Sequence, residues 1–203
     1  YSLFMLALAR KELSACSFRL FVGEKPLLPQ IVEDLSTEVT WEELKEAFTD
    51  EWGVKYSKDG RKILKASKRP RGGYSIKEGT RIICDNAFTL CSSLTSIVIP
   101  NSVASIGKEA FDGCNFLSCL VLPDCVINIG NCAFGGCSSL SNIVIPNSVT
   151  SIGDRTFLLC SSLSSVVIPD SVTSIGDRAF QECSSLPNMV IPDSVTSIGD
   201  RAF

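Results

Sequence analysis

Histidine is absent from this 203-residue chain. Without an imidazole the chain cannot form a Ser-His-Asp or Cys-His nucleophile system, an HExxH zinc site or a histidine general base. Catalysis would instead need paired carboxylates or a lysine in a pocket, and the sequence pattern shows neither arrangement. We therefore predict that the chain is not an enzyme and uses no cofactor or metal.

CxxC pairs and zinc-site spacing are also missing among five of the 10 cysteines, namely Cys16, Cys84, Cys119, Cys125 and Cys132. The other five recur at one position of a repeat: Cys91, Cys114, Cys137, Cys160 and Cys183. A recurring position of this kind is a packing position, so we predict a column of buried thiols rather than disulfides. The cysteines do not define the redox compartment.

A strong net charge is lacking as well. The formal net charge is -3, and residues 74–203 carry 6 basic and 11 acidic side chains. This acidic balance argues against binding of nucleic acid by that part of the chain.

The apolar stretch Tyr1–Ala9 is too short to cross a bilayer, so we expect no transmembrane segment here. The stretch is either the end of a truncated signal peptide or a short amphipathic segment. Leu13–Cys16 resembles a bacterial lipoprotein acylation site, but charged residues interrupt the apolar run before it. Because the chain begins with Tyr and ends on a residue that would open another repeat, we expect a fragment of a longer protein.

The dominant positive feature is a phenylalanine that recurs every 23 residues, at Phe88, Phe111, Phe134, Phe157, Phe180 and Phe203. A fixed period of this length is typical of a solenoid, in which each coil supplies the cover for its neighbour. Within one period, Leu163–Ile168 predicts a strand whose first, fourth and sixth residues face the interior. Pro169 ends this strand, Val172–Ile175 returns along the other side, and Gly176 permits the corner before Phe180.

This pattern resembles the BspA-type leucine-rich repeats over Tyr74–Phe203. The resemblance implies a mainly β, right-handed leucine-rich-repeat solenoid with a parallel concave sheet, made of a half-coil and five coils at residues 74–203. It also implies a non-enzymatic surface protein of anaerobic bacteria or protists that adheres to host matrix proteins or to other cells. The departures from the pattern are Cys119, Cys125, Cys132 and Thr156.

Residues 1–73 lack the repeat and predict a small α+β cap. Phe18–Val22 alternates as a strand does, and Thr40 with Glu43 forms a capping box that predicts a helix to about Asp50. Trp41, Leu44 and Phe48 would share one face of that helix.

A hairpin and a hinge complete the predicted cap. Val54–Tyr56 and Lys62–Leu64 flank a turn that contains Asp59 and Gly60, which is a strong hairpin signal. The run Lys65–Gly73, with one proline and two glycines, predicts a hinge into the solenoid.

Two ladders of outward residues are the candidate binding site on the concave sheet. They are Ser96, Cys119, Asn142, Ser165 and Asn188, and beside them Val98, Val121, Val144, Val167 and Val190. An exposed apolar row marks a binding site, but β-branched neighbours also stabilise a sheet without any partner. Both interpretations remain open.

Two charged features also need an interpretation. Lys62, Lys65, Lys68, Arg69 and Arg71 form a basic patch that is either an anion-binding site or a solvated face. Asp154, Asp177 and Asp200 recur beside arginines, and we expect solvated ion pairs there rather than a calcium site.

The sequence thus predicts a protein-binding module of a cell-surface or secreted adhesin-like protein, which binds a host matrix or cell-surface protein through the concave sheet. The alternative is an intracellular, cytoplasmic scaffold, which the column of thiols would suit.

Overall fold

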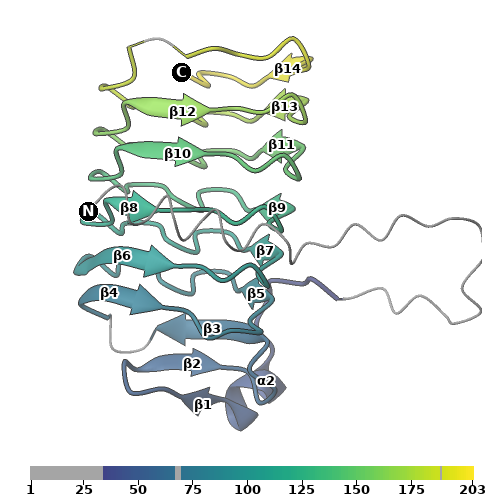
Figure 1. The fold of residues 1–203 in the computed structure, drawn as a ribbon, viewed down its shortest axis with the longest axis vertical. Coiled ribbons are helices and arrows are strands. Elements are labelled where there is room, and N and C mark those ends of the chain that lie inside the picture. The colour runs from purple at the N-terminus through teal and green to yellow at the C-terminus, as the bar shows by residue number, and fades with distance from the viewer. Residues whose placement is uncertain (1–33, 67–69, 188) are drawn as a thin grey trace, which may run out of the picture. The chain divides into compact units, whose positions relative to one another are not determined.

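The computed structural model describes residues 34–66, 70–187 and 189–203. The chain divides into two units, Tyr1–Asp34 and Leu35–Phe203, and only the second is described below. In this unit the chain winds through successive coils that stack along one axis, as Figure 1 shows. The prediction of a mainly β leucine-rich-repeat solenoid is therefore confirmed.

Two columns of short parallel strands run along the stack, five strands in the first column and six in the second. The first strand column contains β4 (Gly72–Ser75), β6 (Leu94–Val98), β8 (Cys119–Leu120), β10 (Asn142–Val144) and β12 (Ser165–Val167). The second contains β5 (Ile82–Ile83), β7 (Ser105–Ile106), β9 (Asn128–Ile129), β11 (Ser151–Ile152), β13 (Ser174–Ile175) and β14 (Ser197–Ile198). Paired residues differ by 23 in number, as Val144 and Val167 do, so the sequence period equals one coil.

A third side of each coil consists of turns, and backbone bonds join these turns from coil to coil. The amide of Phe111 donates to the carbonyl of Ala133 at 2.8 Å, and the amide of Phe157 donates to that of Ala179 at 2.8 Å. Every side of the stack therefore uses the backbone of a neighbouring coil to satisfy its polar groups.

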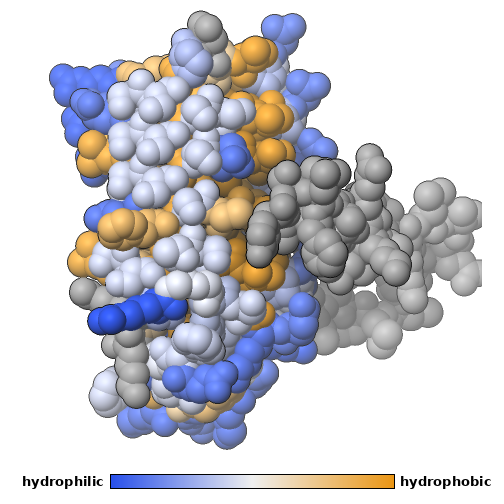
Figure 2. Space-filling model, turned by 60° about the vertical axis from the view of Figure 1, so that its left-hand side comes forward, coloured by the Kyte–Doolittle hydropathy of each residue, from blue (hydrophilic) through white to orange (hydrophobic). Residues whose placement is uncertain are grey.

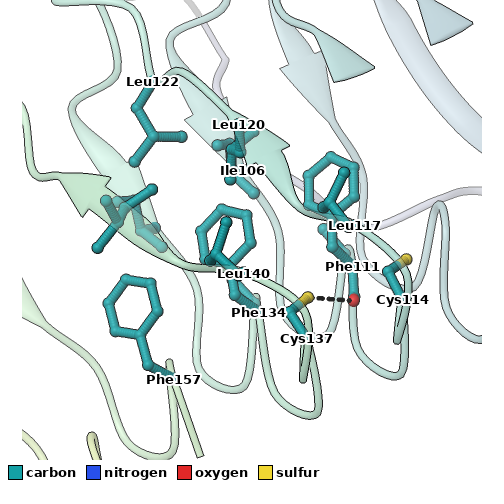
Figure 3. Packing of buried hydrophobic residues seen from close by; sticks show 14 of the residues in the cluster. Ile106, Phe111, Cys114, Leu117, Leu120, Leu122, Phe134, Cys137, Leu140 and Phe157 are labelled. Atoms are coloured by element: carbon teal, nitrogen blue, oxygen red, sulfur yellow. Dashed lines mark hydrogen bonds between the residues drawn. The ribbon is translucent and has the colours of Figure 1, made fainter. Parts of the chain in front are cut away.

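The core is a column of phenylalanine rings. Each ring stacks on the next with centroids 5.2 to 5.8 Å apart and planes within 13°, from Phe88 to Phe203. The five rings from Phe88 to Phe180 are buried, together with the leucines and isoleucines that point inward from both strand columns (Figure 3). Burial of each ring by its neighbour explains why the phenylalanine must recur in every coil.

The predicted column of cysteines lies beside these rings. The Sγ of Cys137 donates to the carbonyl of Phe111 in the preceding coil at 3.3 Å, as Figure 3 shows. The equivalent bonds are made by Cys114, Cys160 and Cys183. These four side chains are buried thiols, which confirms the prediction for them.

Glycine stands at the corner after the second strand column because two coils approach closely there. A Cβ on Gly176 would lie 2.4 Å from Asp154 Oδ1 and 2.6 Å from Asp154 N, both in the preceding coil. The described glycines with positive φ do not include Gly176, so close approach rather than conformational freedom selects it.

Both strand columns are interrupted at the same level. In the described part of the chain, the first column divides into β4–β6–β8 and β10–β12, and the second into a sheet ending at β9 and the sheet β11–β13–β14. On the third side the coils remain joined, because the amide of Phe134 donates to the carbonyl of Thr156 at 3.0 Å. We call this level the seam.

The N-terminal end of the stack is closed by an antiparallel sheet. β1 (Phe48–Thr49), β2 (Val54–Tyr56) and β3 (Lys62–Ala66) form the predicted hairpin and one further strand, and β3 pairs in parallel with β5. Tyr56 and Tyr74 carry the aromatic core into this sheet, and their hydroxyl oxygens lie 2.6 Å apart.

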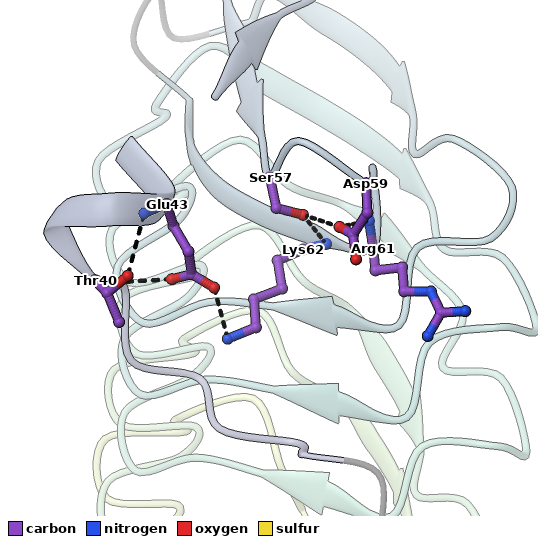
Figure 4. Close-up of polar contacts among 6 residues, drawn as sticks. All are labelled: Thr40, Glu43, Ser57, Asp59, Arg61 and Lys62. Atoms are coloured by element: carbon purple, nitrogen blue, oxygen red, sulfur yellow. Dashed lines mark hydrogen bonds and ion pairs between the residues drawn. The ribbon is translucent and has the colours of Figure 1, made fainter. Parts of the chain in front are cut away.

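The capping box is present, but the helix is shorter than predicted. Helix α2 (Trp41–Glu46) begins after Thr40, whose Oγ1 accepts from the Glu43 amide at 3.1 Å (Figure 4). The helix ends at Glu46 rather than near Asp50 because Phe48 is recruited into β1, where its ring stacks on Tyr56 at 5.5 Å. The predicted strand Phe18–Val22 and the site at Leu13–Cys16 lie outside the described residues.

Candidate binding surface

The predicted valine ladder is exposed along the outer face of the first strand column. Its five members are 55%, 64%, 61%, 52% and 84% exposed, in the order Val98, Val121, Val144, Val167 and Val190. Figure 2 shows an orange hydrophobic stripe along the long axis, beside a broad pale band of intermediate hydropathy. We call the exposed surface of this strand column the valine face.

The neighbouring ladder lies on the same face. Cys119, Asn142 and Ser165 are exposed and Ser96 is half-buried, while Asn188 lies outside the described residues. The register pairs Ser96 with Cys119 and Asn142 with Ser165, so these side chains follow one line across each sheet. The structure thus places the described residues of both predicted ladders together.

The described strands of the valine face carry no charged residue. All five strands of the first column consist of uncharged residues, although 20% of the chain is charged. Charged residues are depleted at the centres of protein interfaces because each charge costs free energy to desolvate. The composition of this face therefore suits contact with another protein surface.

Three polar side chains at the strands of this face are engaged within the chain. Ser164 Oγ donates to the carbonyl of Ser141 at 3.0 Å, and Ser118 Oγ donates to that of Thr95 at 3.4 Å. The amide nitrogen of Asn142 donates to Ser141 Oγ at 3.2 Å. Because these donors already have partners, apolar contact is what the face offers most readily.

The aspartate ladder has a structural role. Asp154 Oδ1 accepts from the amide of Asp177 at 2.9 Å, and Asp177 Oδ1 accepts from that of Asp200 at 2.8 Å. Asn131 makes the same bond to Asp154 at 3.0 Å, so the position needs an oxygen acceptor and no charge. These residues link successive coils rather than form the expected ion pairs. The described residues hold no cluster of His, Cys, Asp and Glu suited to a metal.

The predicted basic patch is partly neutralised. Lys62 Nζ lies 2.9 Å from Glu43 Oε1, as Figure 4 shows, while Lys65 and Arg71 are exposed. Burial acts to raise the pKa of Glu43, but hydrogen bonds from the Thr40 amide and from Lys62 outweigh it, so this pKa is lowered. Lys68 and Arg69 lie outside the described residues. Anion binding by the patch remains a prediction.

One exposed aromatic residue on this side of the stack is absent from the predicted ladders. Phe116 is 62% exposed and immediately precedes the inward-facing Leu117. The signal that identifies it is a comparison of coils, because the equivalent positions hold serine: Ser93, Ser139, Ser162 and Ser185.

The comparisons with known proteins agree with the fold. The family model for the BspA type leucine-rich repeat region matches residues 75–203 in 6 copies. No protein of curated function matches the chain. In the described residues, no helix combines the length and apolar character that a membrane span requires.

Three solved structures illustrate the similarity. A leucine-rich cell-surface protein of Faecalibacterium prausnitzii A2-165 matches with a TM-score of 0.59 and 31% identity, over 77% of this chain and 51% of that protein. A leucine-rich repeat protein of T. pallidum matches with a TM-score of 0.55 and 27% identity, over 73% of this chain and 83% of that one. A leucine-rich repeat protein of Eubacterium ventriosum ATCC 27560 shares the fold at a TM-score of 0.59 and 23% identity, over 77% and 49%.

The chain thus spans about half the length of the Faecalibacterium and Eubacterium proteins. The match to the family model covers more than half of this chain, over the same residues that form the stacked coils. The chain therefore belongs to the BspA type leucine-rich repeat family.

Proposed function

We propose that the chain is a non-enzymatic protein-binding module that binds its partner through the valine face. The observation that supports this proposal is a row of exposed valines along strands that carry no charged side chain in the described part of the chain. β-branched neighbours stabilise a sheet without any partner, but the depletion of charge along all five strands is what the centre of a protein interface shows.

The setting that we propose is a cell-surface or secreted adhesin-like protein, with a host matrix or cell-surface protein as partner. Membership of the BspA type family supports it, as does the similarity to a protein described as a leucine-rich cell-surface protein. The buried thiols are compatible with this setting because their Sγ atoms are shielded in the core.

The test places charge on the valine face without disturbing the core. Val121→Lys, Val144→Lys and Val167→Lys are combined in one variant, since all three side chains point to solvent. The matched control combines Ile127→Lys, Thr150→Lys and Thr173→Lys, which add the same charge in the same coils beside the second strand column.

Binding is measured by biosensor to immobilised collagen, laminin and fibronectin, with circular dichroism as the check on folding. We expect the valine variant to lose binding and the control variant to keep it. Binding that survives in the valine variant, or absence of binding by the unmodified chain, would count against the proposal.

An intracellular scaffold is the second candidate, and the column of buried free thiols is compatible with it. Proteolysis of intact cells that express the full-length protein separates the two settings. A repeat region that external protease cannot reach would favour the scaffold.

A further inference from the structure

The repeats allow the coils to be compared with one another, position by position. One coil, residues 112–134, differs from the others on its outside but not in its core. Its inward residues Leu117, Leu120 and Leu122 are buried, as their equivalents in the coil below are. We call residues 112–134 the divergent coil.

Three outward positions of this coil carry apolar side chains where other coils carry polar ones. Phe116 stands where four other coils have serine, and Cys119 stands where others have Ser96, Asn142 or Ser165. Beside the second strand column, Ile127 is 50% exposed where later coils carry threonine. Serine at the position of Phe116 is evidently sufficient for folding, because it serves there in four coils.

In this coil, Phe116 lies in the turn that precedes β8, Cys119 lies in β8, and Val121 directly follows it. Phe116 and Val121 are 62% and 64% exposed, Cys119 is exposed, and Leu117 and Leu120 are buried. Three exposed apolar side chains therefore lie within six residues at the level of β8. Figure 2 shows lighter orange patches beside the stripe at mid-height, where the pale band is interrupted.

An exposed phenylalanine with no packing role has a large apolar area to offer a partner. Aromatic residues near the centre of an interface carry much of its binding free energy, while surrounding contacts mainly exclude water. The divergent coil has two coils with valine-face strands on one side, β10 and β12, and two on the other, β4 and β6. Phe116, in the turn before β8, thus lies at the middle level of the stack of valine-face strands.

We propose that Phe116, with Cys119 and Val121, is the anchor of the interface, and that the anchor binds an apolar, uncharged segment of a polypeptide partner. The uncharged strands and the engaged hydroxyls define this chemistry, because a charged partner would find no counter-charge on the face. The inference rests on the proposed function of the valine face and identifies the residues that set its specificity.

The experiment selects short random peptides displayed on phage against the whole 203-residue chain. The tightest peptide is then synthesised and used as the probe. We expect the selected peptides to be apolar and uncharged. Phe116→Ser, which installs the residue of the other coils, should weaken binding of the probe by about tenfold or more.

Ile127→Thr is the matched control, since it also replaces an exposed apolar residue of the divergent coil with the residue of later coils. It should leave binding unchanged. Both variants should unfold at nearly the wild-type urea concentration, because neither side chain is part of the core.

The outcomes separate the two proposals. If the three-lysine valine variant loses the probe but Phe116→Ser binds it as the wild type does, the valine face stands and the anchor is wrong. If both variants bind normally, both proposals are wrong. Selected peptides that are charged, or no selection at all, overturn the anchor and its stated partner.

Discussion

At the scale of single residues, the spacing between coils decides which side chains are allowed. Gly176 has backbone atoms of the preceding coil where a Cβ would lie, and Gly199 has the same environment one coil later. Backbone atoms cannot rotate away as a side-chain atom can, so the position excludes every other residue without a shift of the whole coil.

We predict that Gly176→Ala lowers the free energy of unfolding by ~1–3 kcal/mol, the usual cost of overpacking. Urea denaturation measures the change. Gly73→Ala is the control, because its Cβ would meet only Ser96 Oγ at 2.9 Å, and that side chain can rotate. Equal losses in the two variants would show that backbone contact between coils is not the cause.

The buried residues of the core could be predicted from the sequence. Each core position is repeated in successive coils, so the pattern distinguishes a buried column from an isolated apolar residue. The expectation of ion pairs along the aspartate ladder is wrong, because an aspartate next to an arginine in the sequence need not pair with it. Its acceptor role depends on a backbone amide 23 residues away, as between Asp154 and Asp177.

At the scale of elements, tertiary pairing overrides local propensity in the cap. The capping box of Thr40 and Glu43 starts α2 as predicted, but no residue of that helix is buried. Phe48 instead gains a strand partner and a stacked ring in Tyr56. The C-terminal end of α2 therefore depends on the contact of Phe48 with Tyr56, which the local helix pattern does not indicate.

The column of buried thiols contributes to the free energy of unfolding by an amount that depends on pH. Burial raises the pKa of Cys183 to about 11 from an ordinary value of 9.0. Burial likewise raises the pKa of Cys114, Cys137 and Cys160. Below the unfolded pKa, both states hold the proton and the full stability is present. As the pH rises further, the unfolded thiol ionises first, and stability is lost up to the folded pKa.

We predict that the free energy of unfolding falls as the pH rises from about 9 to about 11, and falls less steeply in Cys183→Ala. Urea denaturation across this range measures both slopes. The comparison of slopes is needed because burial also raises the pKa of Tyr56 and Tyr74, which act in the same direction. Identical slopes would mean that the Cys183 thiol makes no contribution to the pH dependence of the free energy of unfolding.

At the scale of the whole described unit, the seam interrupts both strand columns around one continuous core. The phenylalanine column passes through it unbroken, with Phe134 and Phe157 at 5.6 Å. The bonds of the third side also continue, from the amides of Cys132 and Gly136 to the next coil. The sequence could not reveal the seam because side chains repeat across it while the backbone pairing does not.

Backbone amides in the two coils above the seam can show whether the hydrogen bonds across the seam are missing. Ser164, Thr173 and Gly176 each donate a backbone hydrogen bond to the coil below, at 2.9, 2.9 and 2.8 Å. Within the described residues, the equivalent amides of Ser141, Thr150 and Gly153 donate no such bond across the seam. The two sets occupy the same positions of adjacent coils, so they differ in little except this bond.

We predict that the Ser141, Thr150 and Gly153 amides exchange with deuterium faster than the Ser164, Thr173 and Gly176 amides. One hydrogen bond contributes ~1 kcal/mol, which corresponds to roughly a fivefold difference in protection. Residue-resolved exchange by NMR measures it. Equal protection of the two sets would show that the sheets are continuous in solution, and that the stack opens as a single unit rather than at this level.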